Sequence, residues 1–132
     1  MIFLLDTNAV SALTKGNLTF LERGIGFTAA DFVISSIVAH EMFFGIYNSA
    51  RVAANADEAE RLLAAIDVVP FETEDARAAG RIRAELQARG TPIGPYDVLI
   101  AGQALARDLT LISRNMREFS RVPGLRVENW MG

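Results

Sequence analysis

The sequence of 132 residues has no cysteine, one histidine and one lysine. The absence of cysteine excludes a disulfide framework, a thiolate zinc site and a thiol nucleophile. The single histidine, His40, excludes a metal site built from several imidazoles, and we expect a structural rather than a catalytic role for it. No apolar run approaches the roughly 20 residues of a membrane-spanning helix, and no basic segment precedes the apolar start. We therefore expect a cytoplasmic protein without a membrane partner.

The composition favours one well-packed globular domain, residues 1–132. Hydrophobic residues make up 51% of the chain and charged residues 22%, which argues against disorder. The net charge is −3, from 13 basic and 16 acidic residues, so the chain lacks the basic character of a general DNA-coating protein. The charge is uneven: residues 71–132 hold nine arginines, which leaves room for a local arginine patch that binds phosphate.

Short apolar segments alternate with helix-forming segments along the chain. We expect strands at 2–5, 32–34, 68–69, 109–112 and 125–127. We expect helices at 9–13, 18–26, 35–47, 50–66, 73–89, 96–107 and 115–119. In the helix at 73–89, the apolar residues Ala76, Ala79 and Ile82 are predicted to lie on one face. Buried strands joined by helical crossovers predict a three-layer α/β/α fold with a central, mainly parallel sheet. Ligands of such sheets bind at the carboxyl ends of the strands.

Two acidic residues, Asp6 and Glu41, are candidates for a functional site because of their positions in the predicted elements. Asp6 directly follows the first strand, a position that suits both a helix N-cap and a functional carboxylate. Glu41 lies in the helix at 35–47, and a carboxylate among apolar side chains is costly unless it is paired or bound to a metal ion. The residues one turn away from it are Ile37, Val38, Phe44 and Gly45. Gly45 carries no side chain and leaves room for a ligand or another chain.

A third acid, Asp97, lies in the first turn of the helix that Pro95 begins. A charge–dipole contact alone explains an acid at that position. However, Asp97 also heads an inward-facing apolar stripe, which favours a function. Three separated carboxylates without a cysteine or histidine cluster suit a hard cation such as Mg²⁺ or Mn²⁺, which polarises a phosphodiester and activates water.

Further candidates surround these acids. Thr7 and Asn8 are placed to orient Asp6 or to contact a phosphate. Asn115 and Glu118 have the type and spacing of a capping box. The cluster Arg114, Arg117 and Arg121 suits either phosphate binding or a solvated surface.

Five segments in order resemble the PIN-domain family and, within it, the VapC-type ribonuclease toxins of bacterial toxin–antitoxin pairs. The resemblance covers nearly the whole chain. The segments are LLDTN at 4–8, SSIVAHEM at 35–42, GTPIGPYDVLIA at 90–101, NMREF at 115–119 and VPGLRVENW at 122–130.

The resemblance implies a metal-dependent endoribonuclease in which Asp6, Glu41 and Asp97 converge as a catalytic pocket for Mg²⁺ or Mn²⁺. Many members place a fourth acid near the position of Asn115, and here that place is taken by Asn115, by Glu118 or by neither residue. The resemblance further implies an RNA substrate, often tRNA, a homodimer and a VapB-type antitoxin. DNA would be reached only through the antitoxin. The apolar residues of 42–47 lie on more sides of the helix than a single contact with the core would need. We therefore expect the dimer contact and an antitoxin groove there.

Two other classes of function compete with this interpretation. A non-catalytic RNA- or protein-binding module on the same fold has no use for three acids facing phosphate. An aspartyl-phosphate phosphatase or a receiver domain needs a second aspartate two residues after Asp6 and a lysine late in the chain. Position 8 is Asn8, and the only lysine is Lys15.

Overall fold

The computed structural model describes all 132 residues as five strands and seven α-helices, with one 3-10 turn at Ala29–Asp31. The strands are β1 (Phe3–Leu5), β2 (Phe32–Ser35), β3 (Asp67–Val69), β4 (Thr110–Ile112) and β5 (Val127–Glu128). The helices are α1 (Thr7–Thr14), α2 (Leu18–Arg23), α3 (Ser36–Tyr47), α4 (Val52–Ala65), α5 (Thr73–Ala88), α6 (Pro95–Ala106) and α7 (Met116–Phe119). None of these helices combines the length and apolar character needed to cross a bilayer.

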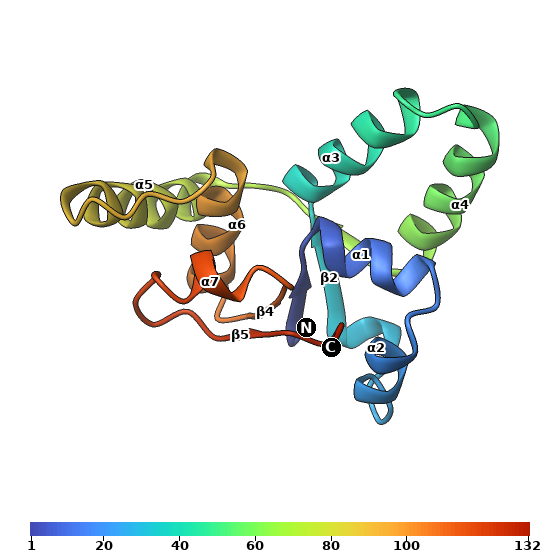
Figure 1. Cartoon of the computed structure of the whole chain (residues 1–132), viewed down its shortest axis with the longest axis horizontal. Coiled ribbons are helices and arrows are strands. Elements are labelled where there is room, and N and C mark those ends of the chain that lie inside the picture. The colour runs from blue at the N-terminus through green and yellow to red at the C-terminus, as the bar shows by residue number, and fades with distance from the viewer.

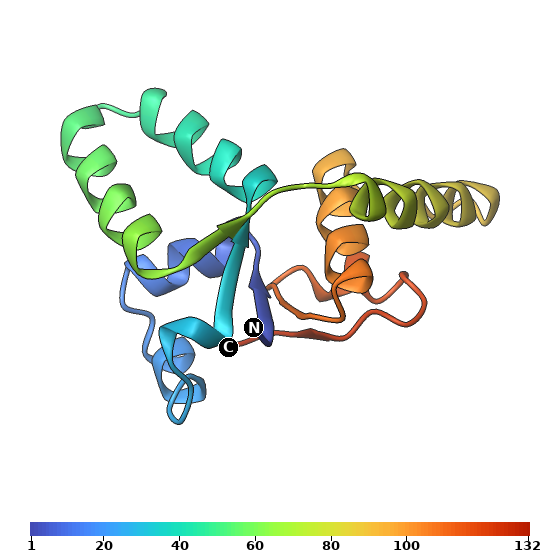
Figure 2. The same cartoon turned by 180° about the vertical axis from the view of Figure 1, so that it is seen from behind.

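The five strands form one sheet in the order β3-β2-β1-β4-β5, and every neighbouring pair is parallel. From β1 the chain moves outward to β2 and β3, then crosses back through α5 and α6 to β4 and β5. Because parallel crossovers are right-handed, the helices of the two directions cover opposite faces. Figure 1 shows α1 to α4 on one side and α5 to α7 on the other. From behind, the chain can be followed from β3 into α5 (Figure 2). The expected three-layer fold is confirmed.

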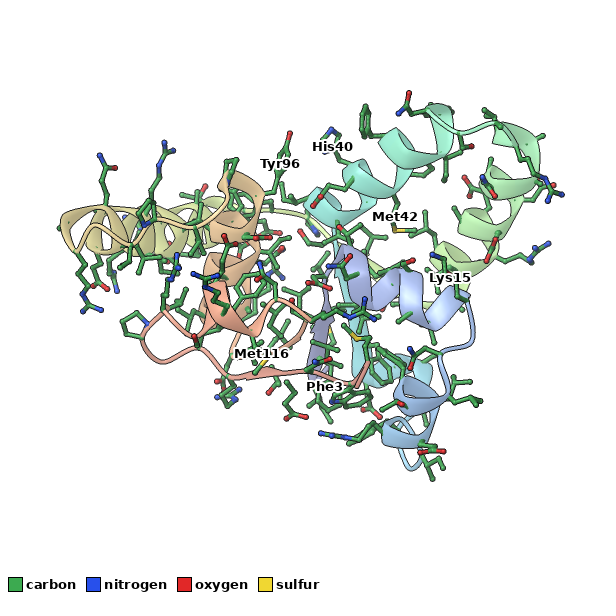
Figure 3. The ribbon with its side chains drawn as sticks, in the orientation of Figure 1. Phe3, Lys15, His40, Met42, Tyr96 and Met116 are labelled. Atoms are coloured by element: carbon green, nitrogen blue, oxygen red, sulfur yellow. The ribbon has the colours of Figure 1, made fainter.

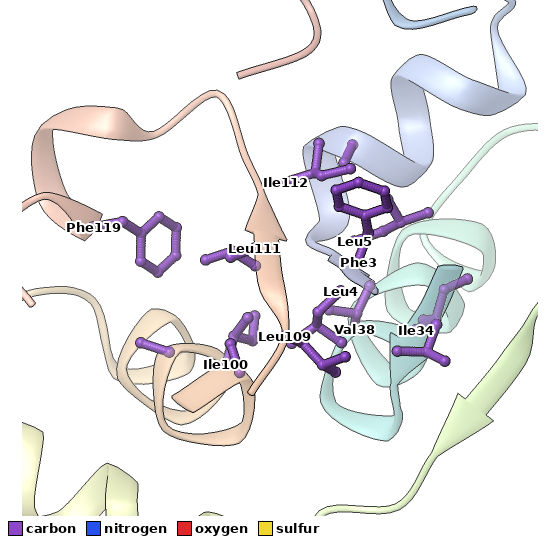
Figure 4. Packing of buried hydrophobic residues seen from close by; sticks show 14 of the residues in the cluster. Phe3, Leu4, Leu5, Ile34, Val38, Ile100, Leu109, Leu111, Ile112 and Phe119 are labelled. Carbon is purple, nitrogen blue, oxygen red and sulfur yellow. The ribbon is translucent and has the colours of Figure 1, made fainter. Parts of the chain in front are cut away.

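The centre of the core is formed by strand residues that are covered on both faces, and buried helix residues pack around them. Leu4, Leu5, Leu111 and Ile112 have no exposed surface, which explains why their strands read as unbroken apolar runs (Figure 4). At the amino end of β1, the ring of Phe3 packs 4.8 Å from that of Trp130, centroid to centroid. Aromatic packing therefore closes the amino end of the sheet, while the carboxyl end carries polar residues.

Two details of the secondary structure differ from the expectation. The last strand comes two residues later than predicted, because Gly124 turns the chain with φ of +79° and the register then pairs Val127 with Leu111. In α5, Ala76 is exposed and the buried face contains Asp75 in its place. The burial of Asp75 is offset by Arg107, whose Nη2 lies 3.0 Å from its Oδ2, and by the backbone N–H of Glu72.

Candidate active site

The crevice beyond β1 and β4 is the point where the strand order reverses, since the chain leaves β1 toward β2 but leaves β4 toward β5. Parallel α/β sheets bind ligands at such a switch point. The residues at the carboxyl ends of these strands are polar and buried: Asp6 after β1 and Ser113 after β4 are 5% and 0% exposed. Ser113 is absent from the sequence-based candidates, although its place directly after a strand matches that of Asp6.

Asp6 serves as the N-cap of α1. Its backbone is extended, and its Oδ1 accepts a hydrogen bond of 2.8 Å from the backbone N–H of Ala9. Burial raises the pKa of the Asp6 carboxyl, hydrogen bonds from Ser113 and from backbone N–H groups oppose this rise, and the charge of Glu41 adds to it. Asp6 therefore caps the helix, and the charge of Glu41 acts on the same carboxylate.

Asp97 lies half-buried in the first turn of α6, where Pro95 occupies one of the first two helical positions. Its Oδ2 accepts a hydrogen bond of 3.2 Å from Nδ2 of Asn115. Burial, followed by a hydrogen bond and charge repulsion from Glu118 and then by the charges of Asp6 and Glu41, raises the pKa of Asp97 to about 6. The charges of Asp6, Glu41 and Glu118 thus all act on Asp97 at this edge.

The predicted capping box at Asn115 and Glu118 is wrong. The Asn115 side chain makes no capping bond to α7, and its Nδ2 instead donates to Asp97 and, at 2.9 Å, to Oε2 of Glu118. This donation and the hydrogen bond with Asp97 lower the pKa of Glu118, and the backbone N–H of Gly94 and the charge of Arg121 act in the same direction. Tertiary partners have replaced the local bonds that the spacing predicts.

Glu41 is half-buried on α3 and makes no ion pair or side-chain hydrogen bond. It lines a pocket between α1, α3 and α4 together with Thr7, whose Oγ1 is buried without a hydrogen-bond partner. The predicted apolar surroundings of Glu41 are only partly found, because Phe44 is 67% exposed. Asn8 is exposed, and its backbone N–H helps to lower the pKa of Asp6.

The remaining candidates lie around this edge. Arg114 and Arg117 are exposed and form no ion pair, which leaves both guanidinium groups available to phosphate. Arg121 donates to the carbonyl oxygen of Pro92 at 3.0 Å and ties the segment after α7 to the loop before α6. His40 lies at the surface, with its ring centroid 5.6 Å from that of Tyr96 (Figure 3).

The acids fit a hard divalent cation by their chemistry. No three of them are placed to hold a single ion together. Mg²⁺ does not require such a cage, because it retains several waters and takes only one or two carboxylates. Burial raises the pKa of both Asp6 and Asp97, so a nearby cation would offset the cost of charging these carboxyl groups. We conclude that one or two of these carboxylates are suited to hold the ion.

Comparison with known proteins identifies the family of the chain. The family model for the PIN domain matches residues 3–125. The chain is 37% identical over 128 residues to the tRNA(fMet)-specific endonuclease VapC of Salmonella typhimurium, with 97% of each chain covered. It is 34% identical over 137 residues to Ribonuclease VapC2 of Rickettsia felis, with 98% of each chain covered. The solved DNA-bound VapBC complex from Salmonella typhimurium contains a chain that matches with a TM-score of 0.91 at 37% identity, covering 98% of both chains. The chain belongs to the PIN-domain family and, within it, to the VapC ribonucleases.

Proposed function

We propose that residues 1–132 form a single nuclease domain that cleaves RNA endonucleolytically with a divalent metal ion, as the toxin of a VapBC-type pair. The observation that carries the proposal is the position of Asp6 and Asp97 at the switch point of the sheet, where the charges of Asp6 and Glu41 both act on Asp97. Mg²⁺, or Mn²⁺ in its place, supplies polarisation of the phosphodiester and activation of water.

The residues have distinct roles in this proposal. Asp6 and Asp97 hold the ion, and Glu41 binds it directly or through a water, or orients the attacking water. Asn115 donates hydrogen bonds from Nδ2 to both Asp97 and Glu118 and so holds these two acids next to each other. Glu118 is thereby better suited to support Asp97 than to replace it as a ligand.

Contacts with the substrate backbone come from the residues that frame the acids. Thr7 and Asn8 at the start of α1 suit a phosphate oxygen, as do the unpaired guanidinium groups of Arg114 and Arg117. Such phosphate contacts position an RNA strand without reading its sequence.

We expect the substrate to be a structured RNA, and tRNA is the first to test because the Salmonella relative is named a tRNA(fMet)-specific endonuclease. The test incubates purified protein with initiator tRNA, elongator tRNAs and unstructured RNA in Mg²⁺, Mn²⁺ or EDTA. Cleavage that requires the metal supports the proposal. Tight RNA binding without cleavage in either metal supports the binding-module alternative instead.

A VapB-type antitoxin and a second copy of the chain are the proposed protein partners. The surface of α3 exposes Phe44 and Tyr47 by 67% and 71%, and such aromatic side chains are enriched at protein interfaces. We place the dimer contact and the antitoxin groove beside this helix, and DNA contact with the antitoxin alone. Light scattering of the free protein tests the dimer, and co-purification with the product of an adjacent short reading frame tests the antitoxin.

A further inference from the structure

The loop of residues 91–94, which joins α5 to α6, forms few hydrogen bonds with its own neighbours in sequence. At its start, the backbone N–H of Thr91 donates to a carbonyl oxygen in the last turn of α5 at 2.9 Å. At its end, the carbonyl oxygen of Gly94 accepts the first bond of α6 at 3.0 Å. Pro92 within the loop and Pro95 after it have no N–H to donate. The position of the middle of the loop therefore depends on bonds from other elements.

Two such bonds come from the segment around α7. Nη1 of Arg121 donates to the carbonyl oxygen of Pro92 at 3.0 Å. A hydrogen bond from the backbone N–H of Gly94 helps to lower the pKa of Glu118. Phe119 is fully buried in the core two residues before Arg121, so the backbone of this segment is anchored. The loop is thus fastened to a part of the chain that the core holds in place.

The fastened loop lies directly against Asp97. A Cβ built on Gly94 would lie 3.3 Å from Oδ2 of Asp97. The same oxygen accepts the hydrogen bond from Nδ2 of Asn115, which also donates to Glu118. The carboxylate of Asp97 is therefore in contact with both the loop and the α7 segment, and a shift of the loop would change its orientation.

Arg121 differs from the two arginines near it in sequence. Arg114 and Arg117 are exposed, and their side chains form no hydrogen bond or ion pair. Arg121 is half-buried, and its guanidinium group is fixed to the backbone of the loop. This difference favours a role for Arg121 in holding the site together over a contact with phosphate.

We propose that Arg121 is a positioning residue for the metal site. By fastening the loop of residues 91–94 to the end of α7, it holds the carboxylate of Asp97 in the orientation that receives a divalent cation. The proposal rests on the proposed function, in which Asp97 is a ligand of the ion. A ligand that is oriented beforehand loses little freedom on binding. Loss of a group that orients a metal ligand typically reduces metal affinity or activity by about 10- to 100-fold.

The first test measures Mn²⁺ binding by isothermal titration calorimetry. Arg121→Met keeps an unbranched apolar stem but removes the donor to the loop, and it is expected to raise the Kd for Mn²⁺ about tenfold. Arg121→Lys keeps a donor and a charge and is expected to recover most of the affinity. Arg126→Met is the matched control and retains the wild-type Kd. Arg126 also donates to a backbone carbonyl, that of Asp108 at 2.9 Å, but at the opposite end of β4 from the site.

The second test separates positioning from a phosphate contact. RNA binding is measured in EDTA, where no metal ion contributes. Arg121→Met is expected to bind RNA as tightly as the wild type, whereas Arg114→Met is expected to bind it more weakly. In Mg²⁺, cleavage by Arg121→Met is expected to fall about tenfold at low concentrations of the ion and to recover at high concentrations, with an unchanged KM for RNA.

The third test perturbs the same contact from the side of the loop. The backbone of Gly94, with φ of −55° and ψ of 150°, suits alanine, so Gly94→Ala is expected to melt within about 5 °C of the wild type. The added Cβ displaces the carboxylate of Asp97, and the Kd for Mn²⁺ is expected to rise about tenfold. Gly80→Ala, at a glycine of α5 with open space around it, is the matched control and keeps the wild-type Kd.

The outcomes distinguish this proposal from the one on which it rests. If the wild type binds Mn²⁺ but cleaves no RNA, the ribonuclease function is wrong, and the Mn²⁺ titrations still decide the role of Arg121. A wild type that binds no Mn²⁺ overturns both. Unchanged Mn²⁺ binding by Arg121→Met overturns the positioning role, and so does a loss of RNA binding in EDTA equal to that of Arg114→Met. Equal losses of Mn²⁺ affinity and melting temperature in Arg126→Met show only a general loosening of the fold and overturn it as well.

Discussion

Replacing Asp97 by asparagine removes one charge from a crowded site while keeping the size of the side chain. Folding raises the pKa of Asp97 from 3.8 to about 6, which corresponds to a penalty of at most about 3 kcal/mol at pH 8. Screening by solvent at this half-buried position reduces the penalty to about 1–2 kcal/mol. We expect Asp97→Asn to gain about this much in unfolding free energy in the absence of metal. The asparagine introduced at position 97 still has an amide oxygen, so it can accept the hydrogen bond that Nδ2 of Asn115 donates to Asp97 in the wild type.

The pH dependence of this gain follows from the direction of the shift. Because the pKa of Asp97 is higher in the folded than in the unfolded chain, the folded state holds the proton more tightly. The stability from that proton is complete below about pH 4 and is lost as the pH rises through about 6. The advantage of the variant is therefore largest at pH 8 and disappears near pH 4. Mg²⁺ reduces it at pH 8 by stabilising the wild type, which binds the ion better.

The assay is urea unfolding at pH 4, 6 and 8, in EDTA and in Mg²⁺, together with RNA cleavage. Asp57→Asn, on the exposed face of α4, controls for the loss of an ordinary surface charge. If the only role of Asp97 is a favourable contact of its charge with the dipole of α6, the variant loses less than about 1 kcal/mol of unfolding free energy at pH 8 and keeps its activity. That result, or a gain in stability independent of pH, refutes the reasoning. Full cleavage by Asp97→Asn removes this residue from the metal site.

Three further perturbations test the fold and the RNA surface. Arg107→Met leaves the buried Asp75 without its counter-charge. The variant is expected to lose about 3–5 kcal/mol of unfolding free energy, measured by urea unfolding. A loss below about 1 kcal/mol would show that the ion pair is dispensable. Gly102→Ala places a Cβ about 2.5 Å from the backbone nitrogen of Ala79, where α5 and α6 meet, and is expected to lower the unfolding free energy by about 1–3 kcal/mol; calorimetry measures this. Arg114→Glu is expected to weaken binding to all RNAs alike and to flatten the dependence of log K on log salt, and an unchanged slope contradicts a phosphate contact.

The fold was predictable because its strands are short apolar runs and its turns carry strong signals. Leu4 and Leu111 lie in segments that are apolar on both faces, which is the pattern of strands in a parallel sheet. The boundary of β5 was not predictable, because the two residues of this strand are set by their pairing with β4 and not by the local sequence. The buried position of Asp75 was equally hidden, since its partner Arg107 is 32 residues away.

The site was predictable in its residue types and only partly in its geometry. Strand ends and helix starts singled out Asp6 and Asp97, and the resemblance to a family brought Glu41 to them. The role of Asn115 could not be read from its spacing to Glu118, because the capping box and the bridge to Asp97 need the same two residues. Which one forms depends on where α6 begins, and that is a property of the tertiary fold.

Asp6 shows why capping and function were not true alternatives. As N-cap of α1, its carboxylate is held by the N–H of Ala9 and by its extended backbone, so its side chain has one orientation before any ligand arrives. A ligand that is already oriented loses little conformational entropy on binding an ion. The cost appears as burial, which raises the pKa of Asp6 and which a nearby cation would offset. The sequence feature that predicts a helix start is thus also the one that makes this carboxylate a rigid candidate ligand at the end of β1.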